Sequence, residues 1–495
     1  MNSFHFSTRT PPEVLGAISS YLTEDDLFSA SQVCQYWRSA LVSFPSLWTR
    51  ISCRRAPQTA TCLQRCRSLP IHLQIKSPFS IVAVEDVLHH ENKVLSLTVQ
   101  HNPRHPPPLH RLLVRSRPHL ERLHIYVKSV WEWRSQEQTM HGAMGDLPSL
   151  RELFICRYCL PIDQLAAPNL VHLALDHAGY GQTVTAQTIL DMLRRCPLLE
   201  TLLISYPDTL LPPTAHGHSP VSLPHLRIIE VGVREVRSGL ITHLDLPKTI
   251  AAGFRALRLS DVCGNITPIV MASIQHVLGR IDIHRITLAN VPNHQANVEF
   301  LLRFEGLLGS LETHVRGKHS AQLPALFGPQ GVIFSHKPRT TEVRELHIVN
   351  CSLDDSQELH LLSAALPNVV SISFFNCSGP HTSETLAPSH SLSPPFPHLE
   401  RVMVLGQESW LEEIVRRRKD LGVRLKTLII GRKPGDFECD LPEDHAVLRG
   451  LVDHLLVGCP VQISEWRAGN EIANAWSTIM APRHVSPRGN LATVT

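Results

Sequence analysis

A short apolar template recurs along most of the chain and constrains its fold more than any other feature. The template reads Pro-x-Leu-x-x-Leu-x-Leu, with other apolar residues allowed at the Leu positions. Its first apolar position moves from residue 94 to residue 425 in steps of 20 to 32 residues, which average about 28. Full copies occupy 118–125, 148–155, 168–175, 197–204, 224–231, 367–374 and 397–404, and weaker copies occupy 94–99, 254–259, 283–288, 311–315, 343–348 and 425–430. One such unit cannot bury its own apolar face, so we expect successive units to stack.

The copies and the stretches between them differ in periodicity. Each copy alternates burial along its length and predicts a short strand, and an earlier strand is expected at 68–75. Helical periodicity marks four of the intervening stretches, 185–195, 270–279, 297–308 and 409–418. The alternation of strand and helix predicts an α/β fold with a parallel sheet.

This template and its spacing resemble those of the leucine-rich-repeat family. The resemblance implies an irregular leucine-rich-repeat solenoid over residues 93–476, with parallel strands on its concave face and helices on its convex face. Three stretches rich in turn formers or without periodicity are expected to be surface loops: 131–145, 207–222 and 378–397. The tail at 477–495 has little to bury and is expected to be disordered.

The segment before the array, up to Trp48, has a helical pattern of its own. Thr10-Pro11-Pro12-Glu13 has the form of a capping box, and Thr23, which precedes three acidic residues, marks a second helix start. Two short amphipathic helices are predicted, and Pro45 ends the second pattern. So small a segment buries too little surface to be firmly stable alone, and we expect another protein to cover part of its apolar side chains.

The stretch from Pro11 to Trp48 resembles an F-box. The residues that carry the resemblance are Pro11, Glu13, Leu15, Ile18, Leu22, Asp26, Leu27, Val33, Cys34, Trp37, Arg38, Pro45, Leu47 and Trp48. Thr10 departs from the family pattern, which has Leu there. The resemblance implies an all-helical F-box domain at 8–53, followed by a linker and first repeat or cap at 54–92. It also implies binding to a Skp-type adaptor, and through it to cullin and RING subunits. Adaptor-binding residues are expected to be Pro11, Val14, Leu15, Ile18, Leu22, Leu27, Val33, Trp37 and Leu41.

The strand residues that flank the last two template positions are expected to face a bound target protein. The candidates for target binding are Arg122, His124, Tyr126, Phe154, Glu230, Arg258, His347, Phe375 and Met403. Both charge signs and several aromatic residues occur among them, which suits a protein partner and forms no basic stripe for nucleic acid. The identity of the target cannot be read from the sequence.

Bulk composition limits the class of protein. Apolar residues make up 43% and charged residues 18% of the chain, as in a folded soluble protein, and the formal net charge is only +3. Nucleic acid is therefore not the expected partner. No apolar run approaches the length that spans a bilayer, so no membrane association is expected and the predicted location is cytoplasmic and/or nuclear. The twelve cysteines are expected to be reduced thiols.

No sequence motif indicates a reaction. Cys62 and Cys66, with His72 beyond, could form a metal cluster, but no second pair at finger-like spacing follows. Cys156 and Cys159 spell C-x-x-C at the end of a repeat strand, where chance is the better interpretation. Phosphate loops, dinucleotide fingerprints and hydrolase motifs do not occur in the sequence. We therefore expect no enzymatic activity, no cofactor and no metal.

The sequence thus favours the substrate-recognition subunit of a Skp–cullin–F-box ubiquitin ligase. Its F-box would bind the adaptor, and its repeats would bind the target. One alternative is a scaffold that binds the adaptor or other proteins without promoting ubiquitination. A metal-dependent enzyme that uses cysteine and histidine is a third hypothesis, which metal analysis of the purified protein would test.

Overall fold

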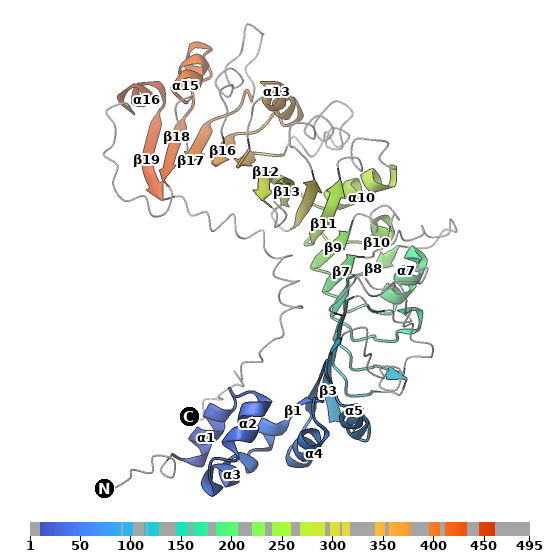
Figure 1. Cartoon of the computed structure of the whole chain (residues 1–495). Helices are drawn as coiled ribbons and strands as arrows, with labels where there is room; N and C mark the ends of the chain where they lie inside the picture. The colour runs from blue at the N-terminus through green and yellow to red at the C-terminus, as the bar shows by residue number, and fades with distance from the viewer. Residues whose placement is uncertain are drawn as a thin grey trace, which may run out of the picture. The chain divides into compact units, whose positions relative to one another are not determined.

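The computed structural model contains two compact units, one with the elements α1 to β7 and the other with β8 to β19 (Figure 1). It describes residues 10–90, 93–101, 113–114, 117–127, 145–156, 158, 162–176, 185–205, 220–232, 240–258, 268–292, 298–306, 309–316, 342–351, 356–375, 377, 396–405, 411–432 and 445–460. The tail predicted at 477–495 and almost all of the three predicted loops lie outside these residues.

The first unit begins with three α-helices and a 3₁₀ turn. They are α1 (Pro12–Ser19), α2 (Glu24–Ala30), α3 (Gln35–Val42) and η2 (Pro45–Trp48). The predicted cap at Thr23 is confirmed, because its hydroxyl oxygen accepts the amide hydrogen of Asp26. The predicted cap at Thr10 is wrong. Pro11 is the N-cap of α1 and makes no side-chain cap hydrogen bond.

The second predicted helix is divided into α2 and α3. The apolar spacing of Leu27, Ala30, Val33, Trp37 and Leu41 continues across the break, which is why periodicity alone joined them. Cys34 breaks the helix because its backbone is extended, with φ −158°. Its sulfur accepts the amide hydrogen of Trp37 and so caps the start of α3.

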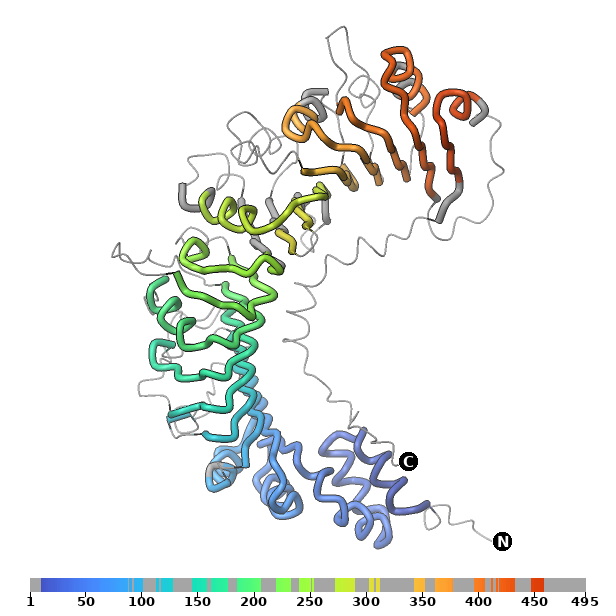
Figure 2. Tube along the Cα trace, turned by 180° about the vertical axis from the view of Figure 1, so that it is seen from behind, coloured from blue at the N-terminus to red at the C-terminus, as the bar shows by residue number. Residues whose placement is uncertain are grey.

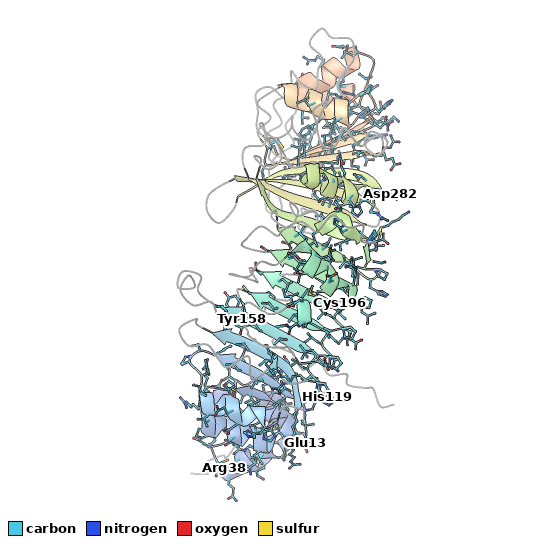
Figure 3. The ribbon with its side chains drawn as sticks, turned by 90° about the vertical axis from the view of Figure 1, so that its right-hand side faces the viewer. Glu13, Arg38, His119, Tyr158, Cys196 and Asp282 are labelled. Atoms are coloured by element: carbon cyan, nitrogen blue, oxygen red, sulfur yellow. The ribbon has the colours of Figure 1, made fainter. Side chains whose placement is uncertain are left out.

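A parallel sheet of seven strands follows in the first unit. The strands pair in chain order: β1 (Arg50–Ser52), β2 (Ile71–Lys76), β3 (Val94–His101), β4 (Arg122–Val127), β5 (Glu152–Cys156), β6 (His172–Asp176) and β7 (Thr201–Ser205). His119 and Cys196 lie beside the ends at which the strands begin, and Tyr158 lies beside the ends at which they finish (Figure 3).

The other described helices of this unit are α4 (Ala56–Arg65), α5 (Ile81–Leu88) and α7 (Ala186–Arg194), with the 3₁₀ turn η5 (Ile162–Gln164). The helix predicted at 185–195 is confirmed as α7, and the strand expected at 68–75 is confirmed as β2. In Figure 2, α7 is packed along one side of the strands. The strand β1 falls within the range expected for the F-box, yet it pairs with β2 and belongs to the sheet.

The register places like template positions opposite one another. One row across β4 to β7 contains Leu123, Leu153, Leu173 and Leu202. The row two residues further along the same face contains Ile125, Ile155, Leu175 and Ile204. All of these side chains are buried. The template therefore marks the core face of each strand, as its alternation predicts.

Replacing Leu173 by Ala should lower the free energy of unfolding by about 2 to 5 kcal/mol. Leu173 is fully buried and stands between Leu153 and Leu202 in the register, so the missing methyl groups would leave a cavity. The measurement is urea unfolding of the full chain, with the exposed Leu198→Ala change as the matched control. Equal midpoints for the two variants would contradict the register.

The second unit contains a larger sheet whose strands do not all follow chain order. From one edge the order is β9 (Ile228–Gly232), β11 (Ala251–Arg258), β14 (Ser310–Arg316), β13 (Val298–Gly306), β12 (Ile283–Pro292), β15 (Glu345–Val349), β16 (Ser371–Phe375), β17 (Arg401–Leu405), β18 (Thr427–Arg432) and β19 (His454–Pro460). All pairs are parallel except those of β13, which is antiparallel to β12 and to β14.

The helix predicted at 297–308 is wrong, because this stretch forms β13. Leu302 and Phe304 are buried, whereas Arg303 and Glu305, which follow them in alternation, are half-buried, as in a strand. The run of apolar residues around them fits a helix equally well, so periodicity does not separate the two. The antiparallel neighbours of β13 give its backbone hydrogen-bond partners on both sides.

The remaining described elements of this unit are short strands, a 3₁₀ turn and helices. They are β8 (Val221–Ser222), η6 (Leu240–His243), β10 (Leu244–Asp245), α10 (Pro268–Leu278), α13 (Ser356–Ala365), α15 (Leu411–Asp420) and α16 (His445–Leu451). The helices predicted at 270–279 and 409–418 are confirmed as α10 and α15. In the described part of the chain, no helix combines the length and apolar character needed to cross a membrane.

Candidate docking surfaces

Several apolar side chains of the first helices are exposed to solvent. Val14 and Ile18 on α1 are 45% and 53% exposed, Tyr21 just after α1 is 76% exposed, and Val33 before α3 is 62% exposed. Pro11, the N-cap of α1, is also exposed. We call these five residues the exposed apolar set. Large exposed apolar side chains concentrated in so short a segment are typical of a segment that binds another protein.

The residues expected to bind the adaptor divide by burial. Pro11, Val14, Ile18 and Val33 belong to the exposed apolar set, and Leu22 and Trp37 are half-buried. Leu15, Leu27 and Leu41 are 4% exposed or less, so their assignment as surface contacts is corrected here. These three leucines hold the helices together, because each occupies the inward-facing position of its helix.

Tyr21 was not among the expected residues, although a signal for it was present. It lies three residues after Ile18 and seven after Val14, which is the spacing of one helical face. Its amide donates to the carbonyl of Ile18 at 3.2 Å, so the helical turn continues to Tyr21 beyond the end of α1.

Close packing fixes the helix that carries this set. A Cβ atom at Gly16 would lie 2.9 Å from the ring of Phe44, so only glycine allows α1 to approach the segment after α3 this closely. At the other end, the hydroxyl of Tyr36 on α3 donates to the carbonyl oxygen of Thr10 at 2.5 Å. The two contacts hold α1 against α3, and Val14 and Ile18 face outward from this pair.

A second group of contacts joins the helical segment to the sheet. The indole of Trp48 is fully buried and donates to the carbonyl of Leu41 at 3.0 Å. Its ring makes an edge contact with Phe28 at 5.4 Å between centroids, and the guanidinium of Arg65 from α4 lies 4.2 Å from its centroid. Arg65 thus covers the Trp48 ring with a cation–π contact.

Glu24 of α2 provides a polar connection at the same junction. Its carboxylate accepts the amide hydrogen of Ser52 in β1 at 2.6 Å, and the thiol of Cys62 in α4 lies 3.9 Å from its other oxygen. Burial raises the pKa of Glu24 above its ordinary value of 4.5, and the hydrogen bonds from Ser52 offset part of this effect. The carboxylate satisfies a backbone donor of β1.

Glu24→Gln should leave stability near neutral pH equal to or above that of the unmodified chain. A carboxyl group with a raised folded-state pKa binds more protons in the folded chain than in the unfolded chain between pH 4.5 and its folded pKa. The stability that it contributes therefore falls as pH rises through this window. Gln keeps the acceptor oxygen for Ser52 and removes the charge, so urea midpoints measured across the window should depend less on pH.

The matched variant is Glu24→Ala, which removes the acceptor and leaves the Ser52 amide without it. This variant should be less stable than Glu24→Gln at every pH in the window. Equal losses for Gln and Ala would show that the carboxylate charge, and not its acceptor role, holds the junction.

Arg122, His124 and Tyr126 of β4 point to the half-buried polar face of the first sheet, as expected. Nε2 of His124 lies 3.6 Å from the carboxylate of Glu152, and its ring makes an edge contact with Phe154 at 6.0 Å between centroids. Phe154 itself is only 4% exposed, so its assignment as a direct target contact is corrected. It supports the His124 ring from the neighbouring strand.

The residues of the second unit that were expected to bind the target differ in burial. His347, Phe375 and Met403 are half-buried strand residues, and the His347 and Phe375 rings make an edge contact at 6.0 Å. Glu230 is 1% exposed and lies in the core, so it is not a surface contact. The strand β11 includes Arg258, whose side chain lies outside the described part of the structure.

An ion-pair network crosses the inserted strands of the second unit. Arg285 of β12 lies 2.6 Å from the carboxylate of Glu345 and 3.4 Å from that of Glu305, and Arg303 lies 2.9 Å from Glu305. Two arginines and two glutamates thus neutralise one another across β12, β13 and β15. Sequence reasoning found neither the network nor β13, because the partners come from distant segments.

Of the described cysteines, Cys34 is half-buried and the others are buried. Burial raises the pKa of Cys53 to about 12 and also raises that of Cys62, so both remain protonated thiols and poor metal ligands or nucleophiles. Among the described residues, no group of three His, Cys, Asp or Glu side chains could hold a metal ion. Cys156 is buried, and Cys159 lies outside the described residues.

Comparison with known protein families identifies a match over the helical segment. Residues 11–54 match a family model described as F-box-like. No curated protein matches the chain. The matched range contains all five residues of the exposed apolar set as well as Glu24 and Trp48. Domains of this kind mediate protein–protein interaction and typically bind Skp-type adaptors, so the match supports an F-box protein.

Proposed function

We propose that this chain is the substrate-recognition subunit of a Skp–cullin–F-box ubiquitin ligase. The observation that supports the proposal most directly is the exposed apolar set within the F-box-like range. Such side chains become buried when an adaptor binds, and large apolar anchors of this kind dominate the affinity of protein interfaces. Cullin and RING subunits would then join through the adaptor.

The strand array would hold the target. We propose that it is an irregular leucine-rich-repeat solenoid, because the template rows stay in register from β3 to β7 and again from β15 to β18. The chain would act by proximity, since it raises the concentration of a bound target near a ubiquitin-charged enzyme held by other subunits. This role requires no catalytic residue in the chain.

The alternative is an adaptor-bound scaffold that does not promote ubiquitination. One experiment separates the two functions. Purified Skp-type adaptor is titrated against the full chain, and the complex is then passed over an immobilised cullin. Saturable adaptor binding followed by cullin retention supports the ligase subunit. Adaptor binding without cullin retention supports the scaffold, and failure to bind the adaptor refutes the ligase subunit and the adaptor-bound form of the scaffold.

A further inference from the structure

The polar face of the first four strands carries no acidic side chain at its ladder positions. The register brings eleven positions of β1 to β4 onto this face in three rows. They are Arg50, His72, Ser96 and Arg122; Ser52, Gln74, Thr98 and His124; and Lys76, Gln100 and Tyr126. We call these eleven residues the donor patch. All of its side chains are half-buried or exposed.

The donor patch combines positive charge with hydrogen-bond donors. Arg50, Lys76 and Arg122 are formally positive, and the other members are histidines, hydroxyl residues and glutamines, all of which can donate. Burial, followed by the charges of Arg122 and Arg50, lowers the pKa of His72 below its ordinary value. The charged groups that act on His72 are thus positive, and both belong to the donor patch.

The patch ends where the next strand begins. Glu152 of β5 stands opposite Arg122 in the register and lies 3.6 Å from the His124 ring, and Asp176 of β6 follows in the third row. The charged side chains on this face therefore change from positive to negative between β4 and β5. Taken together, the candidate target-binding residues of all strands carry mixed charges, whereas the register separates a basic region from an acidic one.

We propose that the donor patch binds an extended acidic segment of the target, whose Asp and Glu carboxylates pair with its basic and hydroxyl side chains. The proposal rests on the proposed role of the array in holding a target. Alternate side chains of an extended chain recur at about 6.6 Å, which is also the spacing between the three rows of the patch. Carboxylates on one side of such a segment can therefore meet successive rows.

The composition favours a peptide over a nucleic acid. Apart from the two histidine rings, Tyr126 is the one aromatic member of the donor patch, whereas single-stranded nucleic acids are bound on several stacking aromatic rings along a longer positive groove. Three formal charges over four strands match a few carboxylates better than a continuous phosphate backbone.

The test uses a fluorescein-labelled peptide of alternating Glu and Ser and the full chain, with binding followed by fluorescence polarisation. The acidic probe should bind, and a Gln–Ser probe of equal length should not. Added salt should weaken the complex, because exposed ion pairs are screened. Arg122→Glu should weaken binding by about tenfold, since it replaces an attraction by a repulsion.

Arg55→Glu is the matched control, because Arg55 is exposed at the start of α4 and stands outside the donor patch. It should leave probe affinity unchanged. Lys76→Glu is a second patch variant, for use if Arg122→Glu fails to fold. Adaptor titration of each variant serves as the folding control. If the unmodified chain binds the acidic probe but does not bind the adaptor, the result contradicts the proposed function and leaves the acidic-segment proposal standing.

Three outcomes would overturn the acidic-segment proposal. They are unchanged affinity in both patch variants, equal binding of the Gln–Ser probe, and tighter binding of a ten-nucleotide RNA than of the acidic peptide. Binding that appears only when the probe serines are phosphorylated would overturn the assignment to carboxylates.

Discussion

Changing Val14 and Ile18 together to Asp should weaken adaptor binding by at least about a hundredfold, which corresponds to about 2.7 kcal/mol. The two side chains lie one helical turn apart on α1 and are about half exposed, so they can form a continuous anchor for the adaptor. Asp at these positions would place unpaired charges in an apolar interface. Isothermal titration of purified adaptor into each full-length variant gives the affinities.

The matched control is Val114 and Leu198 changed together to Asp. These residues are 45% and 42% exposed and lie outside the F-box-like range. The control should bind the adaptor as tightly as the unmodified chain. Both double variants should unfold at similar urea concentrations, because the replaced side chains are exposed. Equal affinities for the two double variants would rule out α1 as the adaptor-binding surface.

Trp48→Ala should lower the free energy of unfolding by about 3 to 5 kcal/mol, the range found for large buried aromatic residues. The indole is fully buried between Phe28 and Arg65, so its removal opens a cavity between the helical segment and α4. Urea unfolding of the first unit, followed by circular dichroism, measures the loss.

Trp48→Phe provides the comparison. It keeps most of the apolar volume and removes the donor to the Leu41 carbonyl, so its cost should be smaller, about 1 to 3 kcal/mol. A cost for Phe as large as that for Ala would show that the hydrogen bond outweighs packing at this junction. An unaltered midpoint in the Ala variant would contradict the described burial of Trp48.

Most of the repeat strands were predictable because their template positions coincide with the core face, although the positions between them are buried as well in β5, β6 and β7. The Leu173 row could be drawn from the template alone, since residues two apart share a face in any strand. The division between α2 and α3 could not, because the apolar spacing continues through Val33 and only the extended backbone of Cys34 interrupts it. Likewise, Leu15 and Ile18 look equivalent in the sequence, but packing buries the first and exposes the second.

Charge organisation was the least predictable part of the surface. The donor patch depends on which strand lies beside which and in what register, and one residue of slip would send Arg122 to the core face. The Arg285 network likewise requires β13 to lie beside β12, whereas the sequence at 297–308 favours a helix. Partners that are distant in sequence leave no local pattern to read.

The strand order β11, β14, β13, β12, β15 has a consequence for how the second unit grows during synthesis. In a simple stacked array each new unit docks on the one made just before it, so folding can proceed unit by unit from the end that is synthesised first. Here β12 emerges before β13 and β14, the strands that separate it from β11. A nascent chain that stops after β12 therefore lacks the neighbour that would hold this strand to the earlier ones. Three strands must be complete before the array can advance to β15.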